Sequence, residues 1–85
     1  MKEIKYIITD PEGIHARPAG EMVKLLKEFK STVTISKDGK STDAKRIFGV
    51  MGLGAKQGQE IQLIVEGEDE AKAIAALDEF LKKQL

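Results

Sequence analysis

The sequence predicts an α+β fold in which helices cover one face of an antiparallel sheet. Three observations support this prediction. The chain has 85 residues, which is enough for one small domain. Apolar and polar side chains alternate in three segments, and apolar residues recur at helical spacing in two others. In chain order the pattern predicts strand, helix, strand, strand, short helix, strand and helix, so we expect residues 1–85 to form a single domain.

The first strand is predicted over residues 2–9, where the alternating pattern gives one apolar face. That face carries Ile4, Tyr6 and Ile8. Residues 10–13 are Asp-Pro-Glu-Gly, a combination typical of turns, and they end the strand. We therefore expect the chain to reach His15, its only histidine, on a loop that leads into a helix.

An amphipathic helix is predicted to follow this loop. Pro18 fits only in the first turn of a helix, which places the helix start at Ala16 to Pro18 and His15 at or just before the N-cap. Apolar residues then recur at three- and four-residue spacing and form a core-facing stripe. The stripe consists of Ala19, Met22, Val23, Leu26 and Phe29.

The remaining strands form the rest of the predicted sheet. Residues 31–37 alternate as a second strand, and Asp38-Gly39 is a strong signal for a tight hairpin turn. Residues 40–43 return as a short polar strand suited to a sheet edge. Residues 59–66 alternate as a fourth strand. After Gly67 a final helix begins with an acidic turn, and its apolar stripe consists of Ile74, Leu77 and Leu81, widened by Ala73 and Phe80.

Residues 44–54 crowd apolar side chains and glycines into a segment that predicts only a short helix. So short a helix cannot bury all of them, and we expect Ile47, Phe48 and Met51 to form an exposed apolar patch. The glycines do not form a nucleotide-binding loop, because no Lys-Ser/Thr pair and no long helix follow them.

Composition argues against several classes of function. The 14 basic and 14 acidic residues give zero net charge, and the three Phe, one Tyr and no Trp offer no platform for stacking bases, so we do not expect a nucleic-acid partner. One histidine and no cysteine supply neither a convincing catalytic triad nor a metal site, and we expect no cofactor. No apolar run approaches the roughly 20 residues of a membrane span, and we expect a cytoplasmic protein.

The position of His15 suggests a chemistry. The first amide protons of a helix lack partners and carry partial positive charge, which attracts an anion and favours neutral imidazole over imidazolium. Arg17 adds a guanidinium suited to phosphate oxygens. A neutral ring nitrogen there could accept a phosphoryl group as a nucleophile. Judged from the residues alone, an ordinary surface histidine beside a solvated arginine is an equally good interpretation.

The segment Gly13-Ile14-His15-Ala16-Arg17-Pro18-Ala19 resembles the active-site signature of HPr, the histidine phosphocarrier family of the phosphoenolpyruvate-dependent sugar phosphotransferase system. Further similarity runs in register through Asp38-Gly39-Lys40-Ser41, Ala44-Lys45, Ile47-Phe48-Gly49-Val50-Met51, Leu53-Gly54 and Gly58. The resemblance implies an open-faced sandwich with a four-stranded antiparallel sheet and three helices on one face.

The resemblance also implies a function and a site. A phosphoryl group would pass from enzyme I to Nδ1 of His15, and from there to an enzyme IIA domain or protein of a sugar transporter. Arg17 and the helix start from Ala16 to Pro18 would hold its oxygens. The chain would be a shuttle, and not an enzyme by itself. A paralogue in a regulatory, nitrogen-linked or dihydroxyacetone phosphorelay is the alternative within the family.

The resemblance assigns partner binding to Ile47, Phe48 and Met51, and we expect the protein to be a monomer. The chain departs from the family at Arg46, where many relatives carry a regulatory serine. Arginine has no hydroxyl to phosphorylate, so we do not expect regulation by the serine-directed HPr kinase. Arg46 would instead offer positive charge to acidic partner surfaces.

Overall fold

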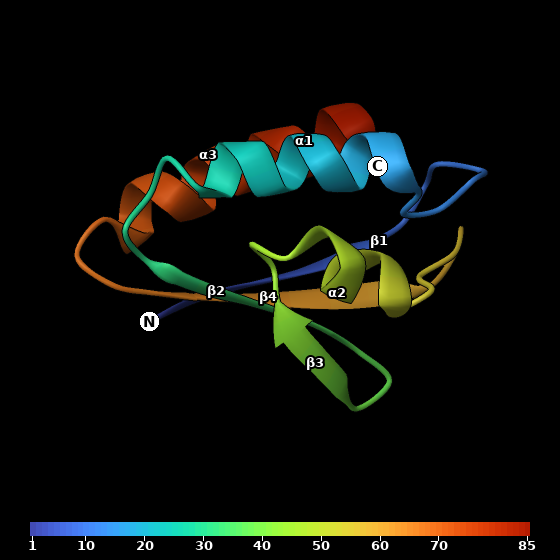
Figure 1. The fold of residues 1–85 in the computed structure, drawn as a ribbon, viewed down its shortest axis with the longest axis horizontal. Coiled ribbons are helices and arrows are strands. Elements are labelled where there is room, and N and C mark those ends of the chain that lie inside the picture. The colour runs from blue at the N-terminus through green and yellow to red at the C-terminus, as the bar shows by residue number, and fades with distance from the viewer.

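The computed structural model describes residues 1–85. It contains a four-stranded sheet and three helices in the predicted order (Figure 1). The strands are β1 (Lys2–Ile7), β2 (Thr32–Lys37), β3 (Lys40–Asp43) and β4 (Glu60–Glu66). The helices are α1 (Ala16–Leu26), α2 (Ile47–Gly52) and α3 (Glu70–Gln84). The α+β fold class predicted from the sequence is therefore confirmed.

The sheet is antiparallel throughout, with the strand order β1-β4-β2-β3. β3 lies at one edge, as its polar sequence predicts, because it offers little apolar surface to another chain. Asp38 and Gly39 join β2 to β3 with φ angles of 49° and 81°. Both angles are positive, which is the tight hairpin geometry that an Asp-Gly pair predicts.

The three helices cover the same face of the sheet (Figure 1). On that face Thr42 of β3 pairs with the buried Ile35 of β2. Gly49 of α2 approaches Thr42 so closely that a Cβ at residue 49 would collide with the threonine hydroxyl. α1 and α3 run alongside each other above the other strands (Figure 1). This arrangement is the predicted open-faced sandwich.

The core lies between the sheet and the helices. In β4 the buried residues alternate as predicted, because every second side chain of a strand points to the same face. The side chains with no exposure in the core are Ala19, Met22, Leu26, Val33, Ile35, Ala44, Val50, Ile61, Leu63, Val65, Ala73, Leu77 and Leu81. None of the three helices is both long and apolar enough to cross a membrane.

Two helices differ in detail from the prediction. α1 ends at Leu26 and does not reach Phe29, because the amides of Glu28 and Phe29 bond to carbonyls only three residues back and tighten the chain into a turn. Phe29 still packs against the core from this turn. In α3 the fully buried stripe runs through Ala73, whereas Ile74 is only partly buried.

Candidate functional site

The loop before His15 is held in place by its backbone. Gly13 has a φ of 67°, and a Cβ at this residue would collide with the carbonyl oxygen of Ala55. The Gly13 amide donates to the carbonyl of Asp10 at 2.9 Å, and the Ile14 amide donates to the carbonyl of Ala55 at 3.0 Å. The chain that follows α2 therefore lies against the loop, and this contact fixes the backbone immediately before His15.

His15 is the N-cap residue of α1, as the sequence predicts. Its backbone is extended, with φ −104° and ψ −177°, and its carbonyl accepts the first bond of the helix from the Ala19 amide at 3.1 Å. Its side chain makes no capping hydrogen bond and is 37% exposed. The backbone amides of Ala16 and Arg17 donate to no group of the protein. This helix start is therefore open to an incoming ligand.

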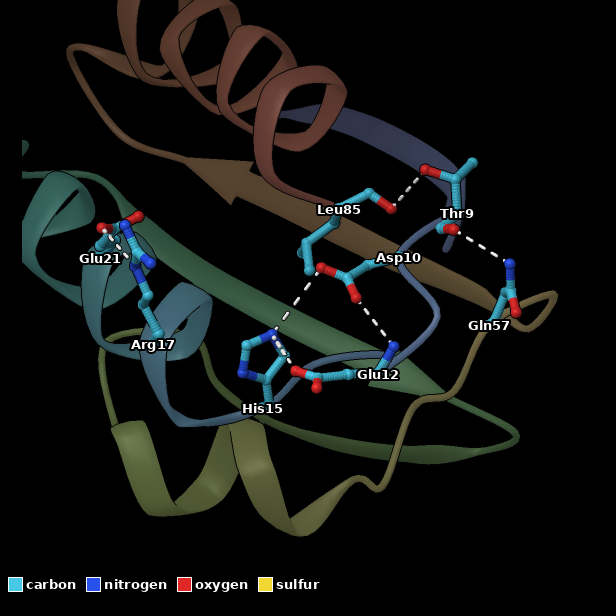
Figure 2. Close-up of polar contacts among 8 residues, drawn as sticks. All are labelled: Thr9, Asp10, Glu12, His15, Arg17, Glu21, Gln57 and Leu85. Carbon is cyan, nitrogen blue, oxygen red and sulfur yellow. Dashed lines mark hydrogen bonds and ion pairs between the residues drawn. The ribbon is translucent and has the colours of Figure 1, made fainter.

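Two carboxylates flank one nitrogen of the His15 ring (Figure 2). Glu12 Oε2 lies 3.3 Å and Asp10 Oδ2 lies 3.7 Å from Nε2. The other Asp10 oxygen, Oδ1, accepts the Glu12 backbone amide at 2.8 Å, so the Asp10 side chain is held by its own loop. The second ring nitrogen, Nδ1, lies on the side of the ring away from both carboxylates (Figure 2).

The two carboxylates are neighbours of His15 that the sequence analysis missed. It treated residues 10–13 only as a turn and considered only the positive field of the helix start, which disfavours imidazolium. A carboxylate beside Nε2 can accept a hydrogen bond from this nitrogen when the nitrogen carries a proton. Acidic residues three and five positions before His15, in a loop bent back by Gly13, were the signal that could have revealed them.

Arg17 does not lie over His15 in this structure. Its side chain is 84% exposed, and it points along α1 so that Nε lies 3.8 Å from Glu21 Oε1 (Figure 2). Pro18 is buried and has no amide proton, so within the predicted helix start only Ala16 and Arg17 have N–H groups to offer. A shallow depression joins these elements to the end of α3, and it is lined by Asp10, His15, Arg17, Pro18 and Gln84.

The same cluster contains three side chains that could ligate a cation. Oxygens of Asp10 and Glu12 and a ring nitrogen of His15 all lie within 4.8 Å of one another. Exposed acidic groups commonly lie this close without a metal, and the Glu12 side chain is 74% exposed. The geometry alone therefore assigns no metal to the site.

The predicted apolar patch is formed mainly by two residues of α2. Phe48 is 84% exposed and Met51 is 36% exposed. Ile47 is only partly buried against the core, and its Cδ1 lies 3.5 Å from where a Cβ on Gly20 of α1 would stand. Ile47 therefore contributes to the contact between α1 and α2 as well as to the patch.

Basic side chains gather beside this patch. Lys27, Lys45 and Arg46 line a groove between α1 and α2 together with Val23, Thr42, Ile47, Phe48 and Gly49. The Lys45 ammonium already has one partner within the protein, because its Nζ donates to the carbonyl of Phe29 at 2.9 Å. Arg46 is exposed at the N-cap of α2 and makes no side-chain capping bond there. The groove thus combines positive charge with apolar surface.

Comparison with known proteins gives one consistent result. Residues 2–83 match the family model described as PTS HPr component phosphorylation site. Over 81 residues the chain is 44% identical to the phosphocarrier protein HPr of Lysinibacillus sphaericus, covering 95% of this chain and 92% of that protein. The structure is similar to HPr-C-His from Thermoanaerobacter tengcongensis, with a TM-score of 0.92 and 41% identity over 98% of this chain and 93% of that chain. The HPr dimer from the same organism is similar with a TM-score of 0.78 and 40% identity, covering 99% and 97% of the two chains.

Proposed function

The chain belongs to the HPr family, the phosphocarriers of the phosphotransferase system, and we propose that His15 carries its phosphoryl group on Nδ1. The observation that carries this proposal is the placement of the two ring nitrogens. Nε2 faces two carboxylates, which would repel a phosphoryl group, whereas Nδ1 lies away from them (Figure 2). A nucleophile needs a free lone pair, and Nδ1 is the nitrogen that offers one.

The groups around Nδ1 suit a phosphoryl group that must be both held and released. The unpaired amides of Ala16 and Arg17 can donate to its oxygens at the helix start. The Arg17 guanidinium can join them, because its exposed side chain is tied only to Glu21 by a 3.8 Å ion pair. A helix start contributes about 0.3 to 1 kcal/mol for an exposed anion, which is weak enough to let the group leave.

The partners follow from the family and from the surface of α2. Enzyme I would load His15, and an enzyme IIA domain or protein would unload it. The exposed Phe48 and Met51 would contact both partners, and Arg46 and Lys27 beside them would face acidic surfaces. We propose that residues 1–85 act as one HPr domain, as a monomer and in the cytoplasm.

The test is the intact mass of the protein after incubation with phosphoenolpyruvate, magnesium and enzyme I. One acid-labile phosphoryl group should appear on the wild type and be absent from His15→Ala. Arg17→Ala should still be labelled, but roughly tenfold or more slowly, because a hydrogen bond to a charged group is worth about 1.5 to 3 kcal/mol. Normal labelling of His15→Ala would refute the assignment of the carrier residue.

Arg46 suggests that this carrier is not controlled through a phosphoserine. The residue is exposed at the start of α2 and places a guanidinium in the groove. The serine-directed HPr kinase with ATP should therefore leave the mass of the wild-type chain unchanged. Labelling of any serine would contradict this part of the proposal, and Arg46→Ser tests whether the position alone decides the outcome.

A further inference from the structure

The negative charge beside Nε2 of His15 does not help the site to bind phosphate. Two carboxylates lie within 3.7 Å of this nitrogen, and both come from the loop that precedes it. Neither accepts a hydrogen bond from the open amides of Ala16 and Arg17 at the start of α1. Their negative charge would disfavour binding of a phosphate dianion, so their presence at the ring requires another explanation.

We infer that Glu12 and Asp10 are positioning residues that keep a proton on Nε2 and thereby keep the phosphoryl group on Nδ1 transferable. The inference rests on the proposed function of His15 and concerns how that same site is regulated by its own loop. It depends on geometry: Glu12 Oε2 and Asp10 Oδ2 lie 3.3 and 3.7 Å from the same nitrogen, and the ring points Nδ1 away from both.

The transfer chemistry shows why a proton on Nε2 matters. In loading, the Nδ1 lone pair forms a bond to phosphorus while the bond between phosphorus and the donor's nitrogen breaks. Because Nε2 keeps its proton, the phosphorylated ring is a cation beside two carboxylates. In unloading, an acceptor nitrogen attacks phosphorus, the Nδ1–phosphorus bond breaks, and neutral imidazole leaves. Without the Nε2 proton the leaving group would be an imidazolate anion, which is a far poorer leaving group.

The Asp10 carboxylate is fixed for this role before any partner arrives. Its Oδ1 accepts the Glu12 amide at 2.8 Å, and its own amide donates to the backbone oxygen of Leu85 at 2.9 Å. Its side chain is 25% exposed, whereas the Glu12 side chain is 74% exposed. Asp10 therefore provides a carboxylate that is fixed in position, and Glu12 an exposed one that lies closer to Nε2.

Other charged groups around the site do not compete for Nε2. Arg17 on α1 is turned toward Glu21. At the end of α3, Lys82 pairs with Asp78 at 3.0 Å and Lys83 pairs with Glu79 at 2.9 Å. Gln84, which also lines the depression, is neutral. Asp10 and Glu12 are thus the only carboxylates paired with the ring.

The test uses Asp10→Asn, Glu12→Gln and the double variant. An asparagine oxygen can still accept the Glu12 amide, so Asp10→Asn removes the charge and retains the turn. Glu68→Gln is the matched control, because it makes the same change in net charge in an exposed turn before α3, far from His15. Each protein is loaded chemically with phosphoramidate in the presence of a chelator, so that loading depends on no partner and no metal is bound.

Two readouts are followed on the phosphorylated proteins. The first is the loss of the phosphoryl group near pH 8, which each single variant should slow by roughly twofold to fivefold, the factor of an exposed ion pair. The second is the pH profile of the ring CH signals in proton NMR of the phosphorylated proteins, which should differ from that of the wild type in each variant because a negative charge beside Nε2 has been removed. The control Glu68→Gln should match the wild type in both.

The outcomes separate this inference from the proposed function. If wild-type protein is labelled by enzyme I but the double variant keeps the wild-type rate and pH profile, the role of Glu12 and Asp10 is refuted and the carrier function stands. A failure of enzyme I to label the wild type refutes the carrier function, whereas the chemically loaded proteins still report on the two carboxylates. An unchanged melting temperature in the variants excludes a purely structural effect.

Discussion

Two helices of this protein begin at opposite ends of the sheet, and their starts are built differently. α1 follows β1 and begins after His15, whereas α3 follows β4 and begins after Asp69. Because β1 and β4 are antiparallel, the two starts lie at opposite ends (Figure 1). A glycine with positive φ precedes each one, Gly13 at 67° and Gly67 at 154°. The backbone before each helix is fixed in a similar way, but the N-cap side chains, His15 and Asp69, differ in their contacts.

The start of α3 is closed by contacts within the protein. The Asp69 carboxylate accepts hydrogen bonds from the Lys30 amide at 2.8 Å and from the Ser31 amide at 2.9 Å. It also accepts one from the Ser31 hydroxyl. These bonds join the N-cap residue of the helix to the segment just before β2, 38 and 39 positions away in sequence. The charged side chain at this start therefore contributes to folding stability.

The start of α1 is left open. Neither N-cap side chain bonds to its own helix, but the His15 side chain, unlike that of Asp69, binds no distant backbone segment, and the amides of Ala16 and Arg17 have no partner within the protein. Such groups contribute little to stability and remain available to a ligand that comes and goes. The contrast indicates that the start of α3 is stabilised by a distant part of the chain, whereas the start of α1 lacks that stabilisation.

The largest effect on stability should come from substitution of the glycine that precedes each helix start. Gly13→Ala should destabilise the fold by about 2 to 4 kcal/mol, because alanine meets both a positive φ and the backbone of Ala55. Gly67→Ala should destabilise the fold by a similar amount, since a Cβ at residue 67 would collide with Ser31. Urea denaturation measures the difference in free energy of unfolding.

The matched control for these variants is Gly58→Ala. Gly58 also has a positive φ, 86°, but no atom lies within 4 Å of where its Cβ would stand. Gly58→Ala should lower the free energy of unfolding by only about 1 kcal/mol, because only the backbone conformation is unfavourable for alanine. Equal losses for Gly13→Ala and Gly58→Ala would show that the close approach to Ala55 does not fix the loop before His15.

The closed start should give a pH-dependent contribution to stability. The hydrogen bond from the Ser31 hydroxyl, and then that from the Lys30 amide, lowers the pKa of Asp69. A carboxylate with a lowered pKa stabilises the fold fully above the pKa of an unfolded aspartate, and this contribution is lost as pH falls through the lowered value. Asp69→Asn should therefore melt below the wild type at neutral pH, and the gap should narrow below about pH 4.

Thermal melts of both proteins across this pH range measure the effect. Glu70 and Glu79 also have lowered pKa values, through hydrogen bonds from the N-terminal amine and from Lys83 respectively, but both proteins retain these groups. The difference between the two curves therefore isolates Asp69. A gap that stays constant down to low pH would mean that the charge of Asp69 contributes nothing.

The fold and the open start could be predicted from the sequence because their signals are local. Alternating residues set the strands, Asp38-Gly39 set the hairpin, and Pro18 set the first turn of α1 beside His15. Each signal spans only a few residues, and a repeating hydrophobic pattern supports it. Family resemblance added the chemistry of His15, which position alone left undecided.

The closed start and the carboxylates at His15 could not be predicted in the same way. The bonds of Asp69 to Ser31 join segments 38 residues apart, and no periodicity in the sequence records such a pairing. Glu12 is close to His15 in sequence, but only the turn at Gly13 brings its carboxylate to Nε2. Contacts that depend on the path of a loop, and not on the periodicity of a helix or strand, can be identified only from the structure.

The smallest effect on stability should come from a substitution at the open start of α1. Arg17→Ala should change the free energy of unfolding by no more than about 0.5 kcal/mol, because its side chain is 84% exposed and holds one 3.8 Å ion pair. The same variant should be labelled slowly by enzyme I. Ser31→Ala should show the reverse, with lower stability and normal labelling, because the Ser31 hydroxyl bonds only to Asp69. Denaturation and labelling of both variants measure the two properties, and a loss of stability in Arg17→Ala comparable to that in Ser31→Ala would contradict the division between an open and a closed start.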